Sequence, residues 1–347
     1  GKAAMEGFCD VDGCEIIVFY PKDGVSPFQE RQMRAQKGQN THVAAILGNF
    51  DDAQSGVKKI FSDKAYQEKL LEKGYRLSSA NSINIGRLVP QIVYYVYAYC
   101  RLQKSGELKA GESLNVSVPT GNFGNILAAY CAKRMGLPLG KLLCASNDNK
   151  VLTDFFRTGI YDKNRPFHVT TSPSMDILIS SNLERLLYFA GENAEECKKL
   201  MEELKEKGKY RISEAMEKEL KDFYSGYGKE AEGSQSIFQT YKETGYVLDP
   251  HTAVAKVVAD HYAYEQGRRD KCLVVSTASP YKFSQTVLKA LKEPVPQDVF
   301  EGIEALEKLW KEPIPAPVKE VEEGEIRHST VCSVEDMEAT VSHFLLS

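Results

Sequence analysis

Short apolar runs alternate with amphipathic stretches from the start of the chain. Residues 15–20 and 42–47 are almost continuously apolar, which is typical of strands buried on both faces of a sheet. Apolar positions at helical spacing predict three helices around these strands, over residues 29–38, 52–61 and 64–73. Strands that alternate with helices favour an α/β domain with a largely parallel sheet, and this first domain ends near residue 80.

The alternation continues over the rest of the chain with longer elements. An apolar residue every four positions from Leu88 to Cys100 predicts a long helix over residues 85–102. Further buried strands are predicted over residues 114–118, 142–145 and 272–276. Two polar stretches complete the pattern: a Glu- and Lys-rich amphipathic helix over residues 194–221, inside a solvated helical insertion at about residues 183–230, and a Pro- and Glu-rich surface linker over residues 313–324.

The composition of the 347 residues is that of an ordinary globular protein, with 42% hydrophobic and 27% charged residues. The formal net charge is −4 and basic residues are interspersed with acidic ones, which argues against a nucleic-acid partner. No apolar run reaches transmembrane length and no signal peptide opens the chain, so we expect a cytoplasmic protein without a membrane partner. The eight cysteines show no metal-ligand spacing, which favours reduced thiols and no metal site.

A glycine-rich turn lies between the strand predicted at 114–118 and the helix that follows it. It reads Pro-Thr-Gly-Asn-Phe-Gly-Asn over residues 119–125. Glycines in such a turn let backbone amides point at one place, and the N-terminus of the following helix adds positive potential. The turn therefore predicts a phosphate site, although a purely structural turn would suffice for this segment alone. Its spacing matches neither the Walker nor the dinucleotide motif, so a nucleotide is not the expected ligand.

Residues 78–87 open the long helix with the sequence Ser-Ser-Ala-Asn-Ser-Ile-Asn-Ile-Gly-Arg. Short amide and hydroxyl side chains at a helix start usually act as caps, which would explain Asn81 and Ser82. Arg87, however, lies in the first turn, where the helix dipole disfavours a cation. An arginine at this position predicts an anion, and its guanidinium together with Asn81 and Ser82 would form a second phosphate site.

The third segment of interest follows the strand predicted at 272–276. Ser279 is a suitable helix cap and Pro280 a suitable first helical residue, so a plain strand-to-helix connection explains both. Thr277 is left at the carboxyl end of the strand, where open α/β sheets bind ligands. Its hydroxyl could bond a heterocyclic nitrogen without keeping that nitrogen protonated, as a carboxylate would.

Taken together, these segments resemble the threonine synthases, within the tryptophan-synthase-β-like group of pyridoxal-phosphate enzymes (fold type II). The resemblance covers nearly the whole chain. It rests on residues 81–87, 121–125 and 249–253 (Asp-Pro-His-Thr-Ala), on Thr277 with Pro280 and Phe283, and on residues 17–21 and 48–52. The glycine-asparagine loop alone occurs in other relatives, whereas its combination with the Asn-Ser…Arg segment is specific for the synthases.

The resemblance implies two doubly wound, open-sheet α/β domains with the cofactor cleft between them. Residues 1–80 would form the small domain, without its N-terminal part. Residues 81–347 would form the large, cofactor-binding domain, with the helical insertion at about residues 183–230.

The resemblance also implies roles for individual residues. The phosphate of the cofactor, pyridoxal 5'-phosphate, would be bound by Gly121, Asn122, Phe123 and Gly124. Thr277 would contact the pyridine nitrogen. The phosphate of the substrate, O-phosphohomoserine, would be bound by Asn81, Ser82, Arg87 and Asn125. Family members remove that phosphate by γ-elimination and add water at the β-carbon to give threonine. An uncharged pyridine is consistent with this route, because it stabilises carbanions less completely.

Two departures from the family pattern bear on activity. Many relatives carry His where this chain has Ser279, which gives no reason to expect inactivity. More seriously, the family's Schiff-base lysine and a Ser-Gly-Asp-Thr-Gly loop precede the helix that begins here at Lys2. We therefore expect that lysine upstream of Gly1, surface or structural roles for Lys2 and Lys282, no catalytic residue within this chain, and an inactive protein if it consists of this chain alone.

Two alternatives to a threonine synthase remain open at this point. One is another fold-type-II lyase that acts on a different phosphorylated amino acid, such as a cysteate synthase or a phospholyase. The other is a non-catalytic relative that binds phosphorylated ligands. The anion site predicted at Asn81, Ser82 and Arg87 suits all of these, and separates them only from dehydratases of free serine or threonine.

Overall fold

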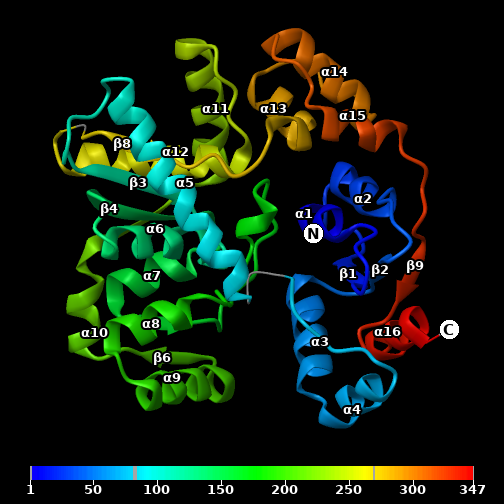
Figure 1. Cartoon of the computed structure of the whole chain (residues 1–347). Helices are drawn as coiled ribbons and strands as arrows, with labels where there is room; N and C mark the ends of the chain where they lie inside the picture. The colour runs from blue at the N-terminus through cyan, green and yellow to red at the C-terminus, as the bar shows by residue number, and fades with distance from the viewer. Residues whose placement is uncertain (1, 81–83, 269, 347) are drawn as a thin grey trace. The chain divides into compact units, whose positions relative to one another are not determined.

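The computed structural model describes residues 2–80, 84–268 and 270–346 (Figure 1). The chain divides into two compact units: unit 1 comprises residues 1–81, 281–284 and 296–347, and unit 2 comprises residues 82–280 and 285–295. Each unit has its own parallel sheet, which confirms the predicted α/β class. Among the described residues, no helix is long and apolar enough to cross a membrane.

The sheet of unit 1 has the strand order β1-β2-β9. Its strands are β1 (Ile16–Pro21), β2 (Thr41–Ile46) and β9 (Thr330–Cys332), all parallel. Both predicted strands are present, and alternate side chains enter different cores as the period of two requires. Val43 and Ala45 pack with Met5, whereas Ile46 packs with Met337.

Helices cover the sheet of unit 1, and local capping sets where several of them begin. They are α1 (Lys2–Phe8), α2 (Pro27–Arg34), α3 (Phe50–Ser62), α4 (Lys64–Glu72), α14 (Val299–Trp310), α15 (Ala316–Glu323) and α16 (Met337–Leu346). Ser26 and Asn49 form capping boxes at α2 and α3, so the start of each helix is encoded by its own sequence.

The C-terminal residues 296–347 belong to unit 1, which corrects the prediction that residues 81–347 form one domain. Strand β9 pairs with β2, and Arg31 of α2 donates to the carbonyls of Val321, Glu322 and Gly324 at the end of α15, at 3.1–3.3 Å. These carbonyls lack partners within their own helix. Such contacts join residues almost 300 positions apart, so no local pattern could predict them.

The sheet of unit 2 has the strand order β7-β4-β3-β8, with every pair parallel. Its strands are β3 (Leu114–Pro119), β4 (Leu139–Ser146), β7 (Phe223–Tyr227) and β8 (Cys272–Val274). Along β4, Leu143 and Ala145 face α12, while Leu142 and Cys144 join the larger core that includes residues of α6 and α7. Burial on both faces explains the continuous apolar runs in the sequence.

Unit 2 has helices on both faces of this sheet and others that contact neighbouring helices. They are α5 (Ile85–Lys104), α6 (Gly124–Arg134), α7 (Val151–Thr158), α8 (Leu183–Gly191), α9 (Ala194–Lys207), α10 (Glu214–Glu219), α11 (Glu230–Thr244), α12 (Pro250–Glu265) and α13 (Ser284–Ala290). Helix α12 contacts all four strands, whereas α6 and α7 contact the sheet from the other face. Short 3₁₀ turns lie at Pro173–Met175, Leu220–Asp222 and Pro280–Phe283.

The predictions for both polar stretches differ from the structure at three places. The expected helix over residues 194–221 breaks at Gly208, whose φ of 73° ends α9, and continues as β6 (Lys209–Arg211), which pairs antiparallel with β5 (Ile160–Asp162). The expected helical insertion also contains β7, a strand of the main sheet. In the expected linker, residues 316–323 form α15.

Candidate functional site

The four strands of unit 2 run parallel, so the segments that follow them emerge at one edge of the sheet. Ser117 pairs with Val274 in this register, and residues 118 and 144 pair on the other side of β3. The loop after β3 (residues 120–125, the phosphate loop) and the segment after β8 (residues 275–279, the β8 exit) therefore share the carboxyl edge. Open α/β sheets bind ligands at this edge. The structure thus brings the predicted phosphate loop and Thr277 to one side of one unit.

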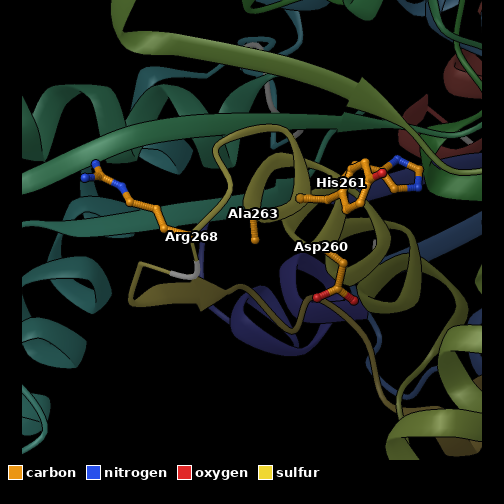
Figure 2. A pocket seen from close by; sticks show the side chains of 5 residues that line it. Asp260, His261, Ala263 and Arg268 are labelled. Atoms are coloured by element: carbon orange, nitrogen blue, oxygen red, sulfur yellow. The ribbon is translucent and has the colours of Figure 1, made fainter.

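A surface pocket lies at the opposite end of α12 (Figure 2). It has a volume of about 520 Å³ and is lined by Asp260, His261, Ala263, Tyr264 and Arg268. Three of these side chains are engaged in ion pairs: Asp260 with Lys256, His261 with Glu232, and Arg268 with Asp270. Helix α12 begins at the carboxyl edge, whereas the lining residues lie in its last turns and just after its end, so the pocket is separate from the predicted site.

Helix α6 starts directly from the phosphate loop without a side-chain cap. Its N-cap is Phe123, and no described side chain accepts a hydrogen bond from the first helical amides. The first backbone bond runs from the Leu127 amide to the Phe123 carbonyl. The amides of residues 124–126 therefore remain at the open end of the helix, where the dipole adds positive potential. This arrangement is suited to binding an anion.

Phe123 serves the loop through its backbone rather than its side chain. The residue is only 1% exposed, and its ring packs against Phe156 and Phe223 at centroid distances of 5.9 and 5.8 Å. Its φ of 63° is left-handed, a conformation that non-glycine residues rarely adopt. Packing of the ring thus stabilises a strained turn, and only the backbone of Phe123 could contact a ligand.

A second segment, residues 172–182, holds the phosphate loop from behind. The Ser180 hydroxyl donates to Gly121 O at 2.7 Å, and Asn182 donates to Asn122 O from its amide (3.1 Å) and from Nδ2 (2.8 Å). A Cβ added at Gly121 would lie 2.3 Å from Ser174 O, so the close approach of two backbones requires glycine here. Sequence reasoning missed these residues. Only the cluster of small polar residues before α8, Ser-Ser-Asn, could have indicated a turn.

Helix α5, which carries Arg87, packs against α6. Asn84 caps this helix through Gly86 N, and Arg87 lies exposed in the first turn, as predicted. One turn later, Gln91 Nε2 is 3.9 Å from the position that a Gly124 Cβ would occupy. The predicted partners Asn81 and Ser82 lie outside the described residues. The structure therefore places the helix of Arg87, but not those two residues, beside the start of α6.

Asn125 is oriented by a buried tyrosine on α5. The Tyr95 hydroxyl donates to Asn125 Oδ1 and, at 3.3 Å, to Asn125 O. Burial raises the pKa of Tyr95 well above its ordinary value, so this hydroxyl stays protonated and acts as a donor. With Oδ1 used as the acceptor, the amide group of Asn125 presents Nδ2 as a donor. Such a donor fits the predicted contact with a substrate phosphate.

Thr277 lies exposed in the β8 exit, just beyond the last backbone bond of the strand. That bond runs from Val275 N to Ser117 O at 2.9 Å. The preceding residue, Ser276, has its Oγ 3.4 Å from Thr252 Oγ1 at the start of α12. The position of Thr277 is therefore set by the sheet on one side and by α12 on the other.

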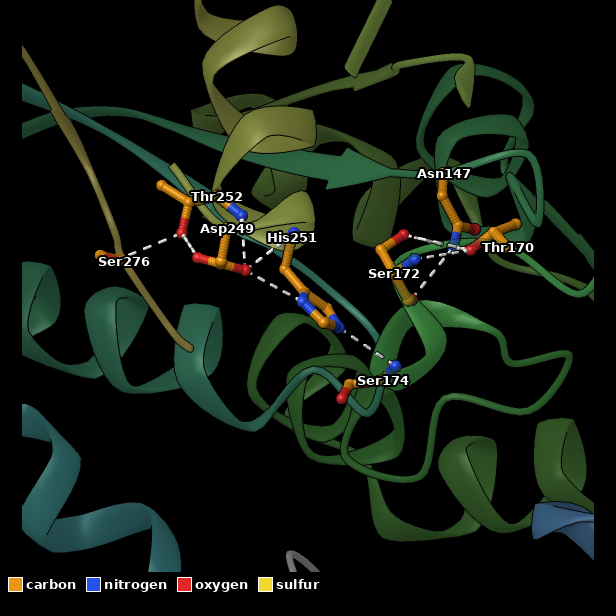
Figure 3. A network of polar contacts seen from close by, with 8 residues as sticks. All are labelled: Asn147, Thr170, Ser172, Ser174, Asp249, His251, Thr252 and Ser276. Atoms are coloured by element: carbon orange, nitrogen blue, oxygen red, sulfur yellow. Dashed lines mark hydrogen bonds and ion pairs between the residues drawn. The ribbon is translucent and has the colours of Figure 1, made fainter. Parts of the chain in front are cut away.

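A network of buried polar side chains connects α12 to the segment behind the phosphate loop (Figure 3). Asp249 caps α12 and contacts His251 Nδ1 at 3.0 Å, and His251 Nε2 accepts from Ser174 N at 3.3 Å. Nearby, Asp176 Oδ1 accepts from Asn147 Nδ2 (2.7 Å) and Asn149 Nδ2 (3.0 Å) after β4. Residues 249–253 contribute to the family resemblance, but no role was predicted for His251.

The two lysines considered in the sequence have different surroundings. Lys2 Nζ donates to Glu6 Oε2 and Gln36 Oε1, both at 2.8 Å, which indicates a structural role within unit 1. Burial lowers the pKa of Lys282, which lies in the 3₁₀ turn after the β8 exit. Among the described residues, no three His, Cys, Asp or Glu side chains gather in a way that could hold a metal ion.

Comparisons with known proteins agree with this arrangement. The family model described as "Threonine synthase, C-terminal" matches residues 252–341. Threonine synthase-like 1 of Homo sapiens is 43% identical over 301 residues, a match that covers 84% of this chain and 40% of that protein. The solved structure of PLP-bound threonine synthase from Brucella melitensis has a TM-score of 0.81 and 36% identity, and the match covers 100% of this chain and 68% of that one. For yeast threonine synthase the TM-score is 0.82 and the identity is 31%, and the match covers 99% of this chain and 67% of that one.

The chain spans less than half the length of the curated threonine synthase-like relative, and about two thirds of the two solved enzymes. Within that span, sequence and fold agree with both solved enzymes over essentially all of this chain. The sequence-based assignment to the family, which rests on residues 121–125 together with the other matching segments, is thereby confirmed. The chain belongs to the threonine synthase family.

Proposed function

We propose that the protein carrying this chain is a pyridoxal-phosphate-dependent lyase that converts O-phospho-L-homoserine and water to L-threonine and phosphate. One observation supports the proposal most strongly: the uncapped start of α6, the helix of Arg87 and the β8 exit with Thr277 all belong to the same unit and surround the same sheet edge. The related threonine synthase from Brucella melitensis has the cofactor bound in its structure.

The phosphate loop fits the phosphate of this cofactor on three counts. The amides at the start of α6 are free of side-chain caps. A Cβ added at Gly124 would approach only the side-chain nitrogens of Asn182 and Gln91, at 3.6 and 3.9 Å, so the backbone there is open to a ligand. Ser181 Oγ is buried without a hydrogen-bond partner among the described residues, between the two residues that hold the loop. An anionic group would provide acceptors that this site lacks.

We assign the cofactor phosphate to the backbone of residues 121–124 and the pyridine nitrogen to the Thr277 hydroxyl. When bound, pyridoxal phosphate supplies an electron sink for the negative charge that develops on substrate carbons. The Thr277 hydroxyl would leave the nitrogen uncharged, because a hydroxyl does not hold a proton there as a carboxylate would.

The substrate phosphate is assigned to Arg87 and Asn125, with Asn81 and Ser82 as further predicted donors. The leaving phosphate gains negative charge as its bond to carbon breaks. The Arg87 guanidinium would stabilise this charge through charge-assisted hydrogen bonds. Asn125 Nδ2, oriented by Tyr95, adds a neutral donor. We propose that neither Lys2 nor Lys282 is the Schiff-base lysine. The Lys2 amine is already bound by Glu6 and Gln36, and we assign Lys282 a structural role in the 3₁₀ turn Pro280–Phe283.

An isotope experiment tests the proposed reaction directly. The active protein is incubated with O-phosphohomoserine and pyridoxal phosphate in ¹⁸O-water, and threonine and phosphate are analysed by mass spectrometry. We expect ¹⁸O in the threonine hydroxyl and none in the phosphate, because the bond from carbon to oxygen is the one that breaks. Label in phosphate, with homoserine as the product, would indicate a phosphatase and contradict the proposal.

The same assay separates the alternatives within the fold class. Release of phosphate without threonine would indicate a phospholyase. Formation of cysteate from O-phosphoserine and sulfite would indicate a cysteate synthase. Cofactor binding without turnover of any of these substrates would favour a non-catalytic relative. The name of the 43% identical relative, threonine synthase-like 1, makes these arms necessary controls.

A further inference from the structure

One buried carboxylate lies between the two segments that we assign to the two ends of the cofactor. Asp249 is 1% exposed and accepts four hydrogen bonds (Figure 3). Oδ1 accepts from the amides of His251 (2.9 Å) and Thr252 (3.3 Å) and from His251 Nδ1 (3.0 Å), and Oδ2 accepts from the Thr252 hydroxyl. Capping α12 requires only the two amides. The bonds to two side chains therefore serve another purpose.

The first side-chain bond leads to the phosphate loop. Because His251 Nδ1 donates to a carboxylate, Nε2 is the acceptor nitrogen, and it accepts from the Ser174 amide at 3.3 Å. The carbonyl of the same residue, Ser174, lies where a Cβ of Gly121 would be only 2.3 Å away. Backbone atoms cannot move aside as the end of a side chain can. The position of Ser174 thus limits the position of Gly121.

The second side-chain bond leads to the β8 exit. Thr252 binds Asp249 Oδ2 through its hydroxyl, and its Oγ1 also lies 3.4 Å from Ser276 Oγ. Ser276 directly precedes Thr277, and β8 ends two residues earlier, at Val274. Beyond the last sheet bond, at Val275, the contact with Thr252 ties the exit to the start of α12.

We propose that Asp249 is a positioning residue that sets the separation between the phosphate loop and Thr277. It acts through His251 on the loop and through Thr252 on the β8 exit. The proposal rests on the proposed function, since these two segments are taken to bind the phosphate and the pyridine nitrogen of one rigid cofactor. A rigid ligand with two attachment points binds well only where their spacing is fixed in advance, which is what a shared buried carboxylate provides.

Two matched pairs of variants separate the branches. His251→Phe removes the acceptor for the Ser174 amide, whereas His251→Gln can restore an acceptor through its side-chain oxygen. Thr252→Val removes the hydroxyl at nearly constant shape, whereas Thr252→Ser retains it. Affinities of each purified variant are measured by titration calorimetry for three probes: pyridoxal phosphate, inorganic phosphate and pyridoxal.

The expected pattern depends on the branch. His251→Phe should weaken pyridoxal phosphate and inorganic phosphate about tenfold and leave pyridoxal within twofold, and His251→Gln should recover most of the loss. Thr252→Val should weaken pyridoxal phosphate and pyridoxal about threefold and leave inorganic phosphate unchanged. Asp249→Asn should weaken all three probes. A residue with a merely structural role would not divide the probes in this way.

Three outcomes would count against the proposal or the function beneath it. Unchanged phosphate affinity in a folded His251→Phe protein, with its circular dichroism intact, would overturn the loop branch. Equal losses on all probes in both pairs would overturn the separation of branches. Binding of inorganic phosphate but not of pyridoxal phosphate by the unmodified protein would refute the proposed function instead, while the His251 pair would still decide whether Asp249 positions the loop.

Discussion

Helices α6 and α12 both begin at the carboxyl edge of the unit 2 sheet, but their first amides have opposite surroundings. At α12, Asp249 accepts from two amides, Pro250 has no amide to satisfy, and the first turn is buried. At α6, the N-cap residue is Phe123, whose ring lies in the core and caps nothing. One helix start satisfies its own donors, whereas the other leaves them open.

This difference separates a helix start that serves the fold from one that is prepared for a ligand. A buried helix start without partners costs stability, so an open one requires compensation. Here the left-handed turn at Phe123, which costs about 1–3 kcal/mol, is offset by the packing of its ring. Under the proposed function, a bound anion would supply the acceptors that the first amides of α6 lack, while α12 would position the phosphate loop through His251 and Ser174.

The largest expected effect comes from removing the self-capped start. Asp249→Ala should lower the free energy of unfolding by about 3–5 kcal/mol, because it removes a cap and leaves buried donors of His251 and Thr252 without partners. Chemical denaturation monitored by circular dichroism measures the change. Asn193→Ala at the exposed start of α9 is the matched control and should cost only about 1 kcal/mol. Equal losses would mean that the network adds nothing to ordinary capping.

A substitution at Arg87, which is proposed to bind the substrate phosphate, should affect activity without affecting the fold. Arg87→Leu in the active enzyme should lower kcat/KM for O-phosphohomoserine about a hundredfold, ~2.7 kcal/mol, and leave unfolding and cofactor affinity unchanged. Steady-state kinetics with this substrate and with an unphosphorylated amino acid are the measurements. Arg101→Leu, in the last turn of the same helix, is the control and should have no kinetic effect. Equal loss on both substrates would make Arg87 a structural residue.

Replacing Gly121 of the phosphate loop by alanine should destabilise the protein. Gly121→Ala should cost about 1–3 kcal/mol of unfolding free energy, because the new Cβ would meet Ser174 O at 2.3 Å and force the loop away. Gly233→Ala in α11, where a Cβ meets nothing within 4 Å, is the control and should stabilise by up to about 1 kcal/mol. Thermal unfolding of the two variants measures these changes. Equal changes in unfolding free energy for Gly121→Ala and Gly233→Ala would show that the phosphate loop shifts easily to accommodate the new Cβ.

The smallest effect on stability is expected at Gly124, at the open start itself. Gly124→Ala should change the unfolding free energy by less than about 0.5 kcal/mol, because its Cβ would be in ordinary contact at 3.6 and 3.9 Å. The same methyl group would stand where a phosphate must approach the amides, so affinity for inorganic phosphate should drop about tenfold. Titration calorimetry with inorganic phosphate measures this affinity. Unchanged affinity for phosphate would mean that the anion does not bind at the start of α6, and the proposed difference between α6 and α12 would not hold.

The site residues that were predicted from the sequence alone share a local signal. Gly121 and Gly124 form a turn between a strand and a helix, and Arg87 opposes a dipole within its own first turn, so neighbours in sequence suffice to predict a role for each. Asn125 was inferred only from the family resemblance. Its orientation by Tyr95 depends on two helices that pack side by side 30 residues apart.

Ser174, Ser180, Asn182 and His251 were not predicted because their contacts cross long stretches of chain. The bond between His251 and Ser174 joins residues 77 positions apart, and those from Ser180 and Asn182 reach back 59 and 60 positions. A serine or histidine in a polar loop has many ordinary roles. Nothing in its immediate neighbours indicates which backbone group it will meet.

The sequence by itself determined strands β1 to β4 and β8, helix starts such as those of α4 and α5, and the glycine turn at residues 121–125, because burial patterns, capping side chains and glycine turns act within a few residues. The tertiary structure alone decided that residues 296–347 return to unit 1, that β7 joins the main sheet and that Asp249 reaches both the phosphate loop and the β8 exit. These features depend on pairing and burial between distant segments. Their free energy arises only when the whole unit has folded, so no stretch of sequence carries it alone.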